Sequence, residues 1–115
     1  MSIALVDYCI QPLYTNKVRI IREPINFEWD SGNLDKNFLK HGVSNQEAEQ
    51  VFINKPNLTL KDVKHSLIEV RFMIWGISNN GRNLNVVFTK RDDKIRIISA
   101  RDMNRKEKQK YEKQF

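Results

Sequence analysis

Residues 67–89 read LIEVRFMIWGISNNGRNLNVVFT, and this stretch decides the fold because its apolar side chains alternate with a period of two. Asn79-Asn80-Gly81 in its middle favours a tight hairpin turn, since Asn and Gly tolerate the positive φ angles that such a turn needs. A second turn at residues 91–94 leads into IRIISA at residues 95–100. The stretch therefore predicts three consecutive antiparallel strands.

A first short helix is predicted before these strands. Asp30 is expected to cap it, and Gly42 is expected to end it in the left-handed conformation. Its apolar residues Leu34, Phe38 and Leu39 share one face, which is expected to face the core.

A second helix is predicted directly after the first. Ser44 and Glu47 have the spacing of a capping box, and Pro56 cannot continue a helix. The residues expected to point inward are Ala48, Val51 and Phe52.

The C-terminal region predicts a third helix, because Asn104 is followed three positions later by Glu107. The expected fold is α+β, with two helices, an antiparallel meander and a terminal helix. Residues 27–115 are expected to form one domain. Residues 1–26 are expected to be an N-terminal extension, either an added strand or a loose arm, because Pro24 interrupts the strand-like residues 17–22.

Length and composition exclude several classes of protein. The chain has 115 residues and a formal net charge of +6, which allows one domain and excludes a multidomain enzyme. Cys9 is the sole cysteine, so no intrachain disulfide and no thiolate zinc site can form, and a reducing cytoplasm is the expected compartment. The early apolar run, residues 3–6, is too short for a signal peptide or a membrane span.

Charge is distributed unevenly along the chain. Residues 90–115 contain ten Lys and Arg against five Asp and Glu, whereas residues 28–54 contain two against five. A basic region of this kind can bind a polyanion such as RNA or DNA, although a solvated Lys-rich surface has the same composition.

Six short motifs occur in the order seen in the BrnT family, which the sequence resembles over about residues 27–113. They are Phe27-Glu-Trp-Asp30, Asn37-x-x-Lys40-His-Gly-Val43, Glu47-Ala48-x-x-Val51-Phe52, Arg71-Phe72, Val86-Val-Phe-Thr89 and Arg96-Ile-Ile-Ser-Ala-Arg101.

The resemblance implies the toxin of a bacterial type II toxin-antitoxin pair, similar in fold to RelE-type ribonucleases. Such a toxin needs no metal or other cofactor and stops translation by cutting RNA. It is neutralised by a ribbon-helix-helix antitoxin, BrnA, and the complex binds operator DNA. A homodimer, or a heterotetramer with the antitoxin, is a further expectation, and no membrane is implied.

Cleavage of RNA without a metal needs a base for the ribose 2′-hydroxyl, an acid for the departing 5′-oxygen and cations for the phosphate. By resemblance, the active surface is a sheet face with basic residues of the middle and last strands, so Arg71, Arg96 and Arg101 are the candidate cations. His65 or Lys40 is the candidate for proton transfer.

Several of these candidates have an alternative structural role. His65 could cap a loop, Lys40 could be a solvated charge, and Arg71 could pair across strands. Arg96 and Arg101 have opposite parity in an unbroken strand, so they share a site only if a bulge or the strand end intervenes after Ser99.

The remaining candidates lie on helices. Tyr111 could stack on a base or assist proton transfer, and His41 could contact RNA or interact with the helix dipole. Arg105, Lys106 and Lys108 form either a solvated face or a salt-dependent RNA contact. Trp29, Trp75 and Phe52 are interpreted as core. The rival function is a non-catalytic nucleic-acid-binding or scaffold module.

Overall fold

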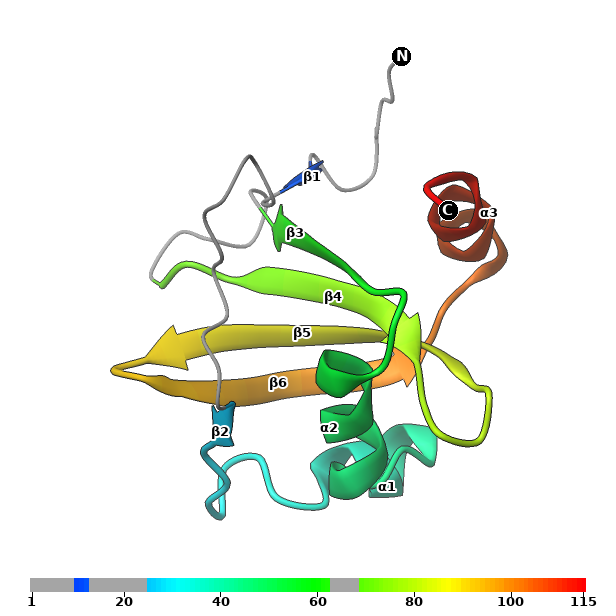
Figure 1. Ribbon diagram of the computed structural model, residues 1–115. Helices are drawn as coiled ribbons and strands as arrows, with labels where there is room; N and C mark the ends of the chain where they lie inside the picture. The colour runs from blue at the N-terminus through cyan, green and yellow to red at the C-terminus, as the bar shows by residue number, and fades with distance from the viewer. Residues whose placement is uncertain (1–9, 13–24, 63–68) are drawn as a thin grey trace.

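One sheet with helices on both faces forms the architecture of this protein (Figure 1). The computed structural model describes residues 10–12, 25–62 and 69–115. The six strands follow the order β1-β3-β4-β5-β6-β2, and the predicted α+β class is confirmed. The elements are β1 (Ile10–Pro12), β2 (Asn26–Phe27), α1 (Lys36–His41), α2 (Asn45–Ile53), β3 (Leu58–Asp62), β4 (Phe72–Ile77), β5 (Asn83–Arg91), β6 (Lys94–Asp102) and α3 (Arg105–Lys113).

The predicted three-stranded meander is present as β4, β5 and β6. Gly81 has a φ angle of +81° in the first turn, and Asp92 has one of +56° in the second. Strands β3 and β1 extend the sheet beyond β4 with antiparallel pairing, so residues 10–12 of the N-terminal extension add a strand. At the opposite edge β2 pairs with β6 in parallel, which makes the sheet mixed.

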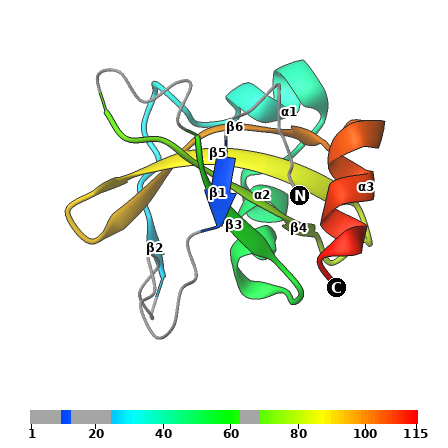
Figure 2. The same cartoon turned by 90° about the horizontal axis from the view of Figure 1, so that it is seen from above.

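Two hydrophobic cores lie on opposite faces of the sheet. In the first core, Val51 and Phe52 of α2 pack on β4 and β5, as predicted, together with Ala48. In the second core, Tyr111 of α3 packs on Met73 and Trp75 of β4. Figure 2 shows α3 at one end of the sheet and the β5–β6 turn at the other. One end of the second face is therefore covered by α3. Among the described residues, no helix is long and apolar enough to cross a membrane.

The prediction for the start of α1 is wrong. The helix begins at Lys36, preceded by Asp35 with a φ angle of +58° and no side-chain capping bond. Asp30 instead binds the guanidinium of Arg96, 66 residues away in sequence. Gly42 ends the helix in the left-handed conformation, as predicted.

The predicted inward face of α1 is also wrong, since the exposed fractions of Leu34, Phe38 and Leu39 are 49%, 57% and 85%. Asn33 and Asn37 are buried against β6 instead. The Asn33 amide donates to the carbonyl of Ile97, and the Asn37 side-chain oxygen accepts from the Ala100 N–H. The reason is that backbone groups of β6 buried beneath this segment need hydrogen-bond partners, which amides supply and leucines do not.

The helix caps agree with the sequence in two places and differ in one. Ser44 accepts a hydrogen bond from the Glu47 N–H, which confirms the predicted start of α2. The Glu47 carboxylate does not return to Ser44 but binds Ser78 and Arg82. The capping box with both bonds present is that of Asn104 and Glu107 at the start of α3.

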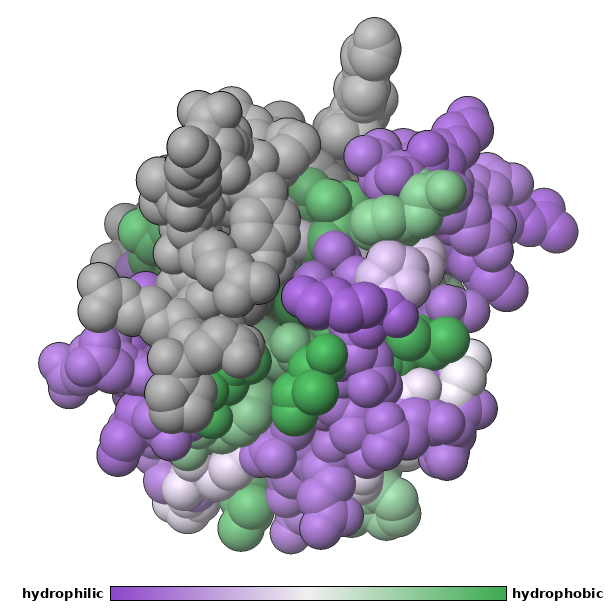
Figure 3. All heavy atoms as spheres, viewed as in Figure 1, coloured by the Kyte–Doolittle hydropathy of each residue, from purple (hydrophilic) through white to green (hydrophobic). Residues whose placement is uncertain are grey.

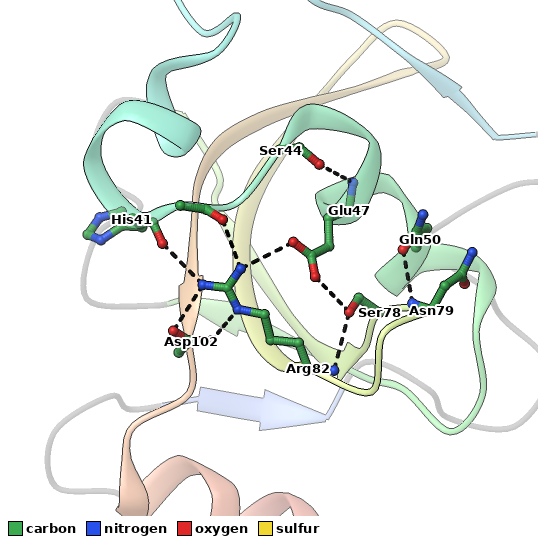
Figure 4. A network of polar contacts seen from close by, with 9 residues as sticks. His41, Ser44, Glu47, Gln50, Ser78, Asn79, Arg82 and Asp102 are labelled. Atoms are coloured by element: carbon green, nitrogen blue, oxygen red, sulfur yellow. Dashed lines mark hydrogen bonds and ion pairs between the residues drawn. The ribbon is translucent and has the colours of Figure 1, made fainter.

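Arg82, just after the β4–β5 turn, connects three separate parts of the fold (Figure 4). Its Nε and Nη2 atoms donate to the two carboxylate oxygens of Asp102 at 2.6 and 3.1 Å. Its Nη1 atom donates to the Gly42 carbonyl and to Glu47, and its Nη2 atom also donates to the His41 carbonyl. The guanidinium therefore binds the C-terminal end of α1, the first turn of α2 and the end of β6.

Substituting Arg82→Ala is expected to lower the free energy of unfolding by about 2–3 kcal/mol, because it leaves the largely buried Glu47 carboxylate without its cation and the end of α1 without donors. Chemical denaturation measures this change. The matched control is the exposed Arg105, for which substitution by alanine is expected to cost less than about 0.5 kcal/mol. Equal effects of the two substitutions would contradict the role assigned to Arg82.

Candidate functional site

A row of polar side chains crosses β6, β5 and the residue before β4, at the end of the sheet away from α3; Arg71 precedes β4 and does not lie within a strand as expected. Thr89 of β5 lies opposite Arg96 of β6, and its hydroxyl donates to the Val70 carbonyl at 2.8 Å, next to Arg71. Phe72 and Phe88, the neighbours of Arg71 and Thr89, point into the first core, so alternation directs the row to the opposite face. With strands about 4.8 Å apart, the backbones of Arg71 and Arg96 are about 10 Å apart.

A β-bulge in β6 decides which arginines share this face. Val87 pairs with Ser99 and Phe88 with Ile97, so Ile98 is the extra residue, one position before Ser99. As a result Arg96 and Arg101 are directed to the same face, opposite Thr89 and Asn85. Thr89 and Asn85 are four positions apart on β5, which separates the arginines by about 13 Å, so they share a face but not one binding point.

The two arginines, Arg96 and Arg101, belong to separate groups of charged and polar residues. We call the group near the β5–β6 turn the turn-end cluster; it consists of Glu28, Asp30, Glu69, Arg71, Thr89, Arg91 and Arg96. We call the group near α3 and the end of α1 the helix-end cluster; it consists of Lys40, His41, Arg82, Arg101, Asp102, Arg105, Lys106 and Glu107.

In the turn-end cluster, Arg96 is held by two carboxylates. Asp30 accepts two hydrogen bonds from it, at 2.9 and 3.0 Å, and Glu28 Oε1 lies 3.6 Å from its Nη1 atom. Arg91 Nη1 lies 3.7 Å from the same Glu28 oxygen. The hydrogen bond from Arg96, and then that from the Gly32 N–H, lowers the pKa of Asp30. Conversely, the hydrogen bond to Asp30 raises the pKa of Arg96.

Glu28 was not a candidate from the sequence, but its geometry suits acid-base chemistry. Its Oε1 atom is buried and, among the described residues, accepts no hydrogen bond. This carboxylate oxygen therefore lies within ion-pair distance of two guanidinium groups, those of Arg91 and Arg96, without a hydrogen bond from either. Glu28 and Arg96 are 68 positions apart in the chain, and no local sequence pattern indicates that they meet.

In the helix-end cluster, Arg101 is bound to a fully buried carboxylate. Its two Nη atoms donate to Glu107 at 2.9 and 2.8 Å, and Glu107 has an exposed fraction of 0%. Asn85 also donates to Glu107, at 2.9 Å. Arg101 therefore neutralises the Glu107 charge, which has no access to water.

The neighbouring Asp102 has its pKa lowered chiefly by the hydrogen bond from Arg82 and further by His41.

The other predicted site residues that the structure describes lie on α1 and α3, outside the row. Lys40, Arg105, Lys106 and Lys108 are exposed on α1 and α3, and His41 is half-buried at the end of α1. Tyr111 is buried, donates its hydroxyl proton to the Pro56 carbonyl at 2.6 Å, and has its pKa raised by burial. Its role in catalysis stays a prediction, as do the roles of the other candidates. His65 lies outside the described residues.

Residues 29–107 match the profile of the family described as "Ribonuclease toxin, BrnT, of type II toxin-antitoxin system". The chain belongs to the BrnT family. The resemblance expected from the motifs is thereby confirmed, and membership of a type II system implies an antitoxin partner. No curated protein matches the chain. The matched segment contains all of the helix-end cluster and starts one residue after Glu28 of the turn-end cluster. In the part of this BrnT chain that the structure describes, no three His, Cys, Asp or Glu side chains are grouped to hold a metal ion.

The lowered pKa values of Asp30 and Asp102 predict loss of stability in acid. A carboxylate whose pKa is lower in the folded protein stabilises the fold above its ordinary value of 3.8, and this contribution is lost as the pH falls through the folded pKa. Asp102→Asn is expected to lower stability at pH 7 and to flatten its decline between about pH 5 and pH 2. Urea unfolding over this range measures both effects. An unchanged acid decline would contradict the assignment.

Arg101→Ala is expected to lower the free energy of unfolding by about 2 kcal/mol, because Glu107 would be buried without its cation. Adding Glu107→Gln in the same chain is expected to recover part of this loss, since the unpaired charge is then removed. Denaturation of the two single variants and the double variant gives the coupling energy. Strict additivity would contradict a direct Arg101–Glu107 interaction.

Proposed function

We propose that this BrnT chain is a metal-independent endoribonuclease toxin with a RelE-like fold, and that the turn-end cluster is its catalytic site. The single observation that carries the proposal is Glu28, a half-buried carboxylate between Arg91 and Arg96 whose Oε1 atom accepts no hydrogen bond from the residues that the structure describes. Its partner would be a BrnA-type ribbon-helix-helix antitoxin, and the complex would bind operator DNA. Membership of a ribonuclease toxin family supports the reaction class.

In the proposed reaction, the Glu28 carboxylate accepts the proton of a ribose 2′-hydroxyl. The 2′-oxygen then bonds to the adjacent phosphorus, and the P–O5′ bond breaks. The products are a 2′,3′-cyclic phosphate and a 5′-hydroxyl, whose proton comes from an acid. His65, in the connection between β3 and β4, is the candidate acid. The connection joins the row next to Arg71, where β4 begins.

The arginines of the row would stabilise the charge that grows on the phosphate. Arg96 and Arg71 lie on either side of Thr89, which is buried, so a phosphate would be bound by the two long side chains and not by Thr89 itself. Such a phosphate would compete with Asp30 for Arg96, and Asp30 is exposed enough to leave. The guanidinium is thus held in place before RNA binds.

The helix-end cluster would extend the RNA-binding surface. Exposed Arg105 and Lys108, with Lys106, carry positive charge on α3, and Lys40 does so on α1. Arg82 and Arg101 are neutralised by their carboxylates, so they add less. This cluster is expected to supply affinity that falls with salt.

The rival function, a non-catalytic nucleic-acid-binding or scaffold module, is favoured by one observation. Arg96 and Arg101, the two candidate cations of β6, are both already bound to carboxylates. If those ion pairs never open, the chain would hold RNA or an antitoxin without cutting. The cleavage assay below distinguishes the two functions.

Glu28→Gln and Arg96→Ala are each expected to slow the cleavage step by about a hundredfold or more, with RNA affinity changed only a few-fold, because both groups act mainly in the transition state. Lys108→Ala is the control, and it is expected to weaken binding in a salt-dependent way and to leave the cleavage step unchanged. Single-turnover cleavage of an RNA oligonucleotide in EDTA measures the step.

Cleavage that requires a divalent cation would overturn metal independence. Wild-type cleavage that neither Glu28→Gln nor Arg96→Ala reduces would overturn the assignment of the turn-end cluster. Thermal unfolding of each variant shows whether a loss of activity comes from a loss of fold. Arg96→Lys keeps the charge but loses the two-pronged contact, so it is expected to be intermediate.

A further inference from the structure

The first helical segment has its polar and apolar sides reversed relative to an ordinary surface helix. Asn33 and Asn37 are buried against the sheet, while Leu34, Phe38 and Leu39 are exposed. Two hydrogen bonds fix this orientation: Asn33 donates to the Ile97 carbonyl, and Asn37 accepts from the Ala100 N–H. The segment cannot rotate to bury its leucines without breaking those bonds.

Arg82 fixes the same orientation from the other end of the helix. It binds the carbonyls of His41, the last residue of α1, and of Gly42, the C-cap residue. The apolar side is thus presented to solvent by contacts at both ends of the segment. Figure 3 shows hydrophobic side chains emerging between hydrophilic ones over α2 and at the lower edge, where α1 lies. We call Leu34, Phe38 and Leu39 the α1 patch.

Charge borders the α1 patch on one side. At 100° per residue, Leu39 points directly away from the buried Asn37. Phe38 lies on one flank of Leu39, and the exposed Lys36 and Lys40 lie on the other. A complementary partner therefore has an apolar stripe bordered by acidic residues, which is an amphipathic helix.

We propose that the α1 patch is the surface on which the antitoxin anchors, through an amphipathic helical segment whose acidic border pairs with Lys36 and Lys40. This inference rests on the proposed function as a toxin, since the family implies an antitoxin and the chain itself is basic, with a net charge of +6. An apolar surface with a charged border is what a protein partner needs. RNA is bound by cations and aromatic rings, and the exposed Leu34 and Leu39 supply neither.

The α1 patch adjoins the turn-end cluster. Gly32 lies two residues before Leu34, and a Cβ atom at Gly32 would stand 2.9 Å from Arg96 Nη2 and 3.1 Å from Asp30 Oδ1. A segment anchored on the patch therefore needs only a short extension to cover Arg96. The anchor and the inhibited site are neighbours but use different residues.

The test measures binding of the protein encoded in the reading frame beside this chain's gene. Leu39→Ser and Phe38→Ser are each expected to weaken its affinity by about tenfold or more, because truncating a central apolar anchor costs at least a factor of ten. Ile53→Ser is the matched control, since Ile53 is a large apolar residue that is 64% exposed on α2. It is expected to leave affinity unchanged. Isothermal titration calorimetry gives the affinities, and RNA cleavage is assayed on the same preparations.

The affinity and cleavage measurements together support or overturn the anchor. Loss of affinity in both patch variants, with cleavage and the Ile53→Ser control unchanged, supports the anchor. Unchanged affinity in the patch variants overturns it and leaves the catalytic proposal standing, provided cleavage is seen. Equal losses in Ile53→Ser overturn the claim of a specific patch. A wild-type chain that does not bind this protein, or a chain that dimerises alone through Leu39, also overturns the anchor. Absence of cleavage counts against the proposed function independently.

Discussion

The five hydrogen bonds of the Arg82 guanidinium are the interaction on which the arrangement of this protein most depends. They use every N–H of the side chain and satisfy carbonyls at the C-terminal end of α1 that have no partner within the helix. They also neutralise Glu47 and Asp102. One side chain thus sets where α1 lies against β6. The same contact fixes which side of α1 meets solvent, and so links the fold to the proposed binding surface.

The second constraint is that the two ends of one sheet face are covered differently. The bulge at Ile98 turns Arg96 and Arg101 to the same side, but α3 covers only the end that holds Arg101. There Glu107 is buried and Arg101 serves to neutralise it. At the other end Arg96 meets carboxylates that are partly exposed to water. A phosphate can compete for an arginine whose partners are solvated far more readily than for one that holds a buried charge.

Local signals in the sequence predicted the local structure. Gly42, Ser44 and the Asn104–Glu107 pair each act within one turn of helix, and all three mark helix ends as expected. The Asn80-Gly81 turn and the meander after it also follow from residues close in sequence. The BrnT motifs predicted the family, and the match over residues 29–107 confirms it.

The predictions that were wrong concern residues whose contacts lie far away in the sequence. Asp30 has the side chain of a helix cap, but it accepts two charge-assisted hydrogen bonds from Arg96 instead of capping a helix. The pattern of Leu34, Phe38 and Leu39 predicts a buried face only if nothing polar needs the space, and β6 needs the amides of Asn33 and Asn37. Glu28 was missed because its neighbours come from the far end of the chain.

The central claim is that RNA is cut at the row of Arg71, Thr89 and Arg96. The most direct test is backbone amide NMR of the isotope-labelled chain titrated with a 2′-O-methyl RNA oligonucleotide, which lacks the attacking hydroxyl. We expect the amide signals of Thr89 and Arg96 to shift strongly, with smaller shifts along α3 and none at Leu39. Strong shifts confined to α3, with Thr89 and Arg96 unmoved at saturation, would contradict it.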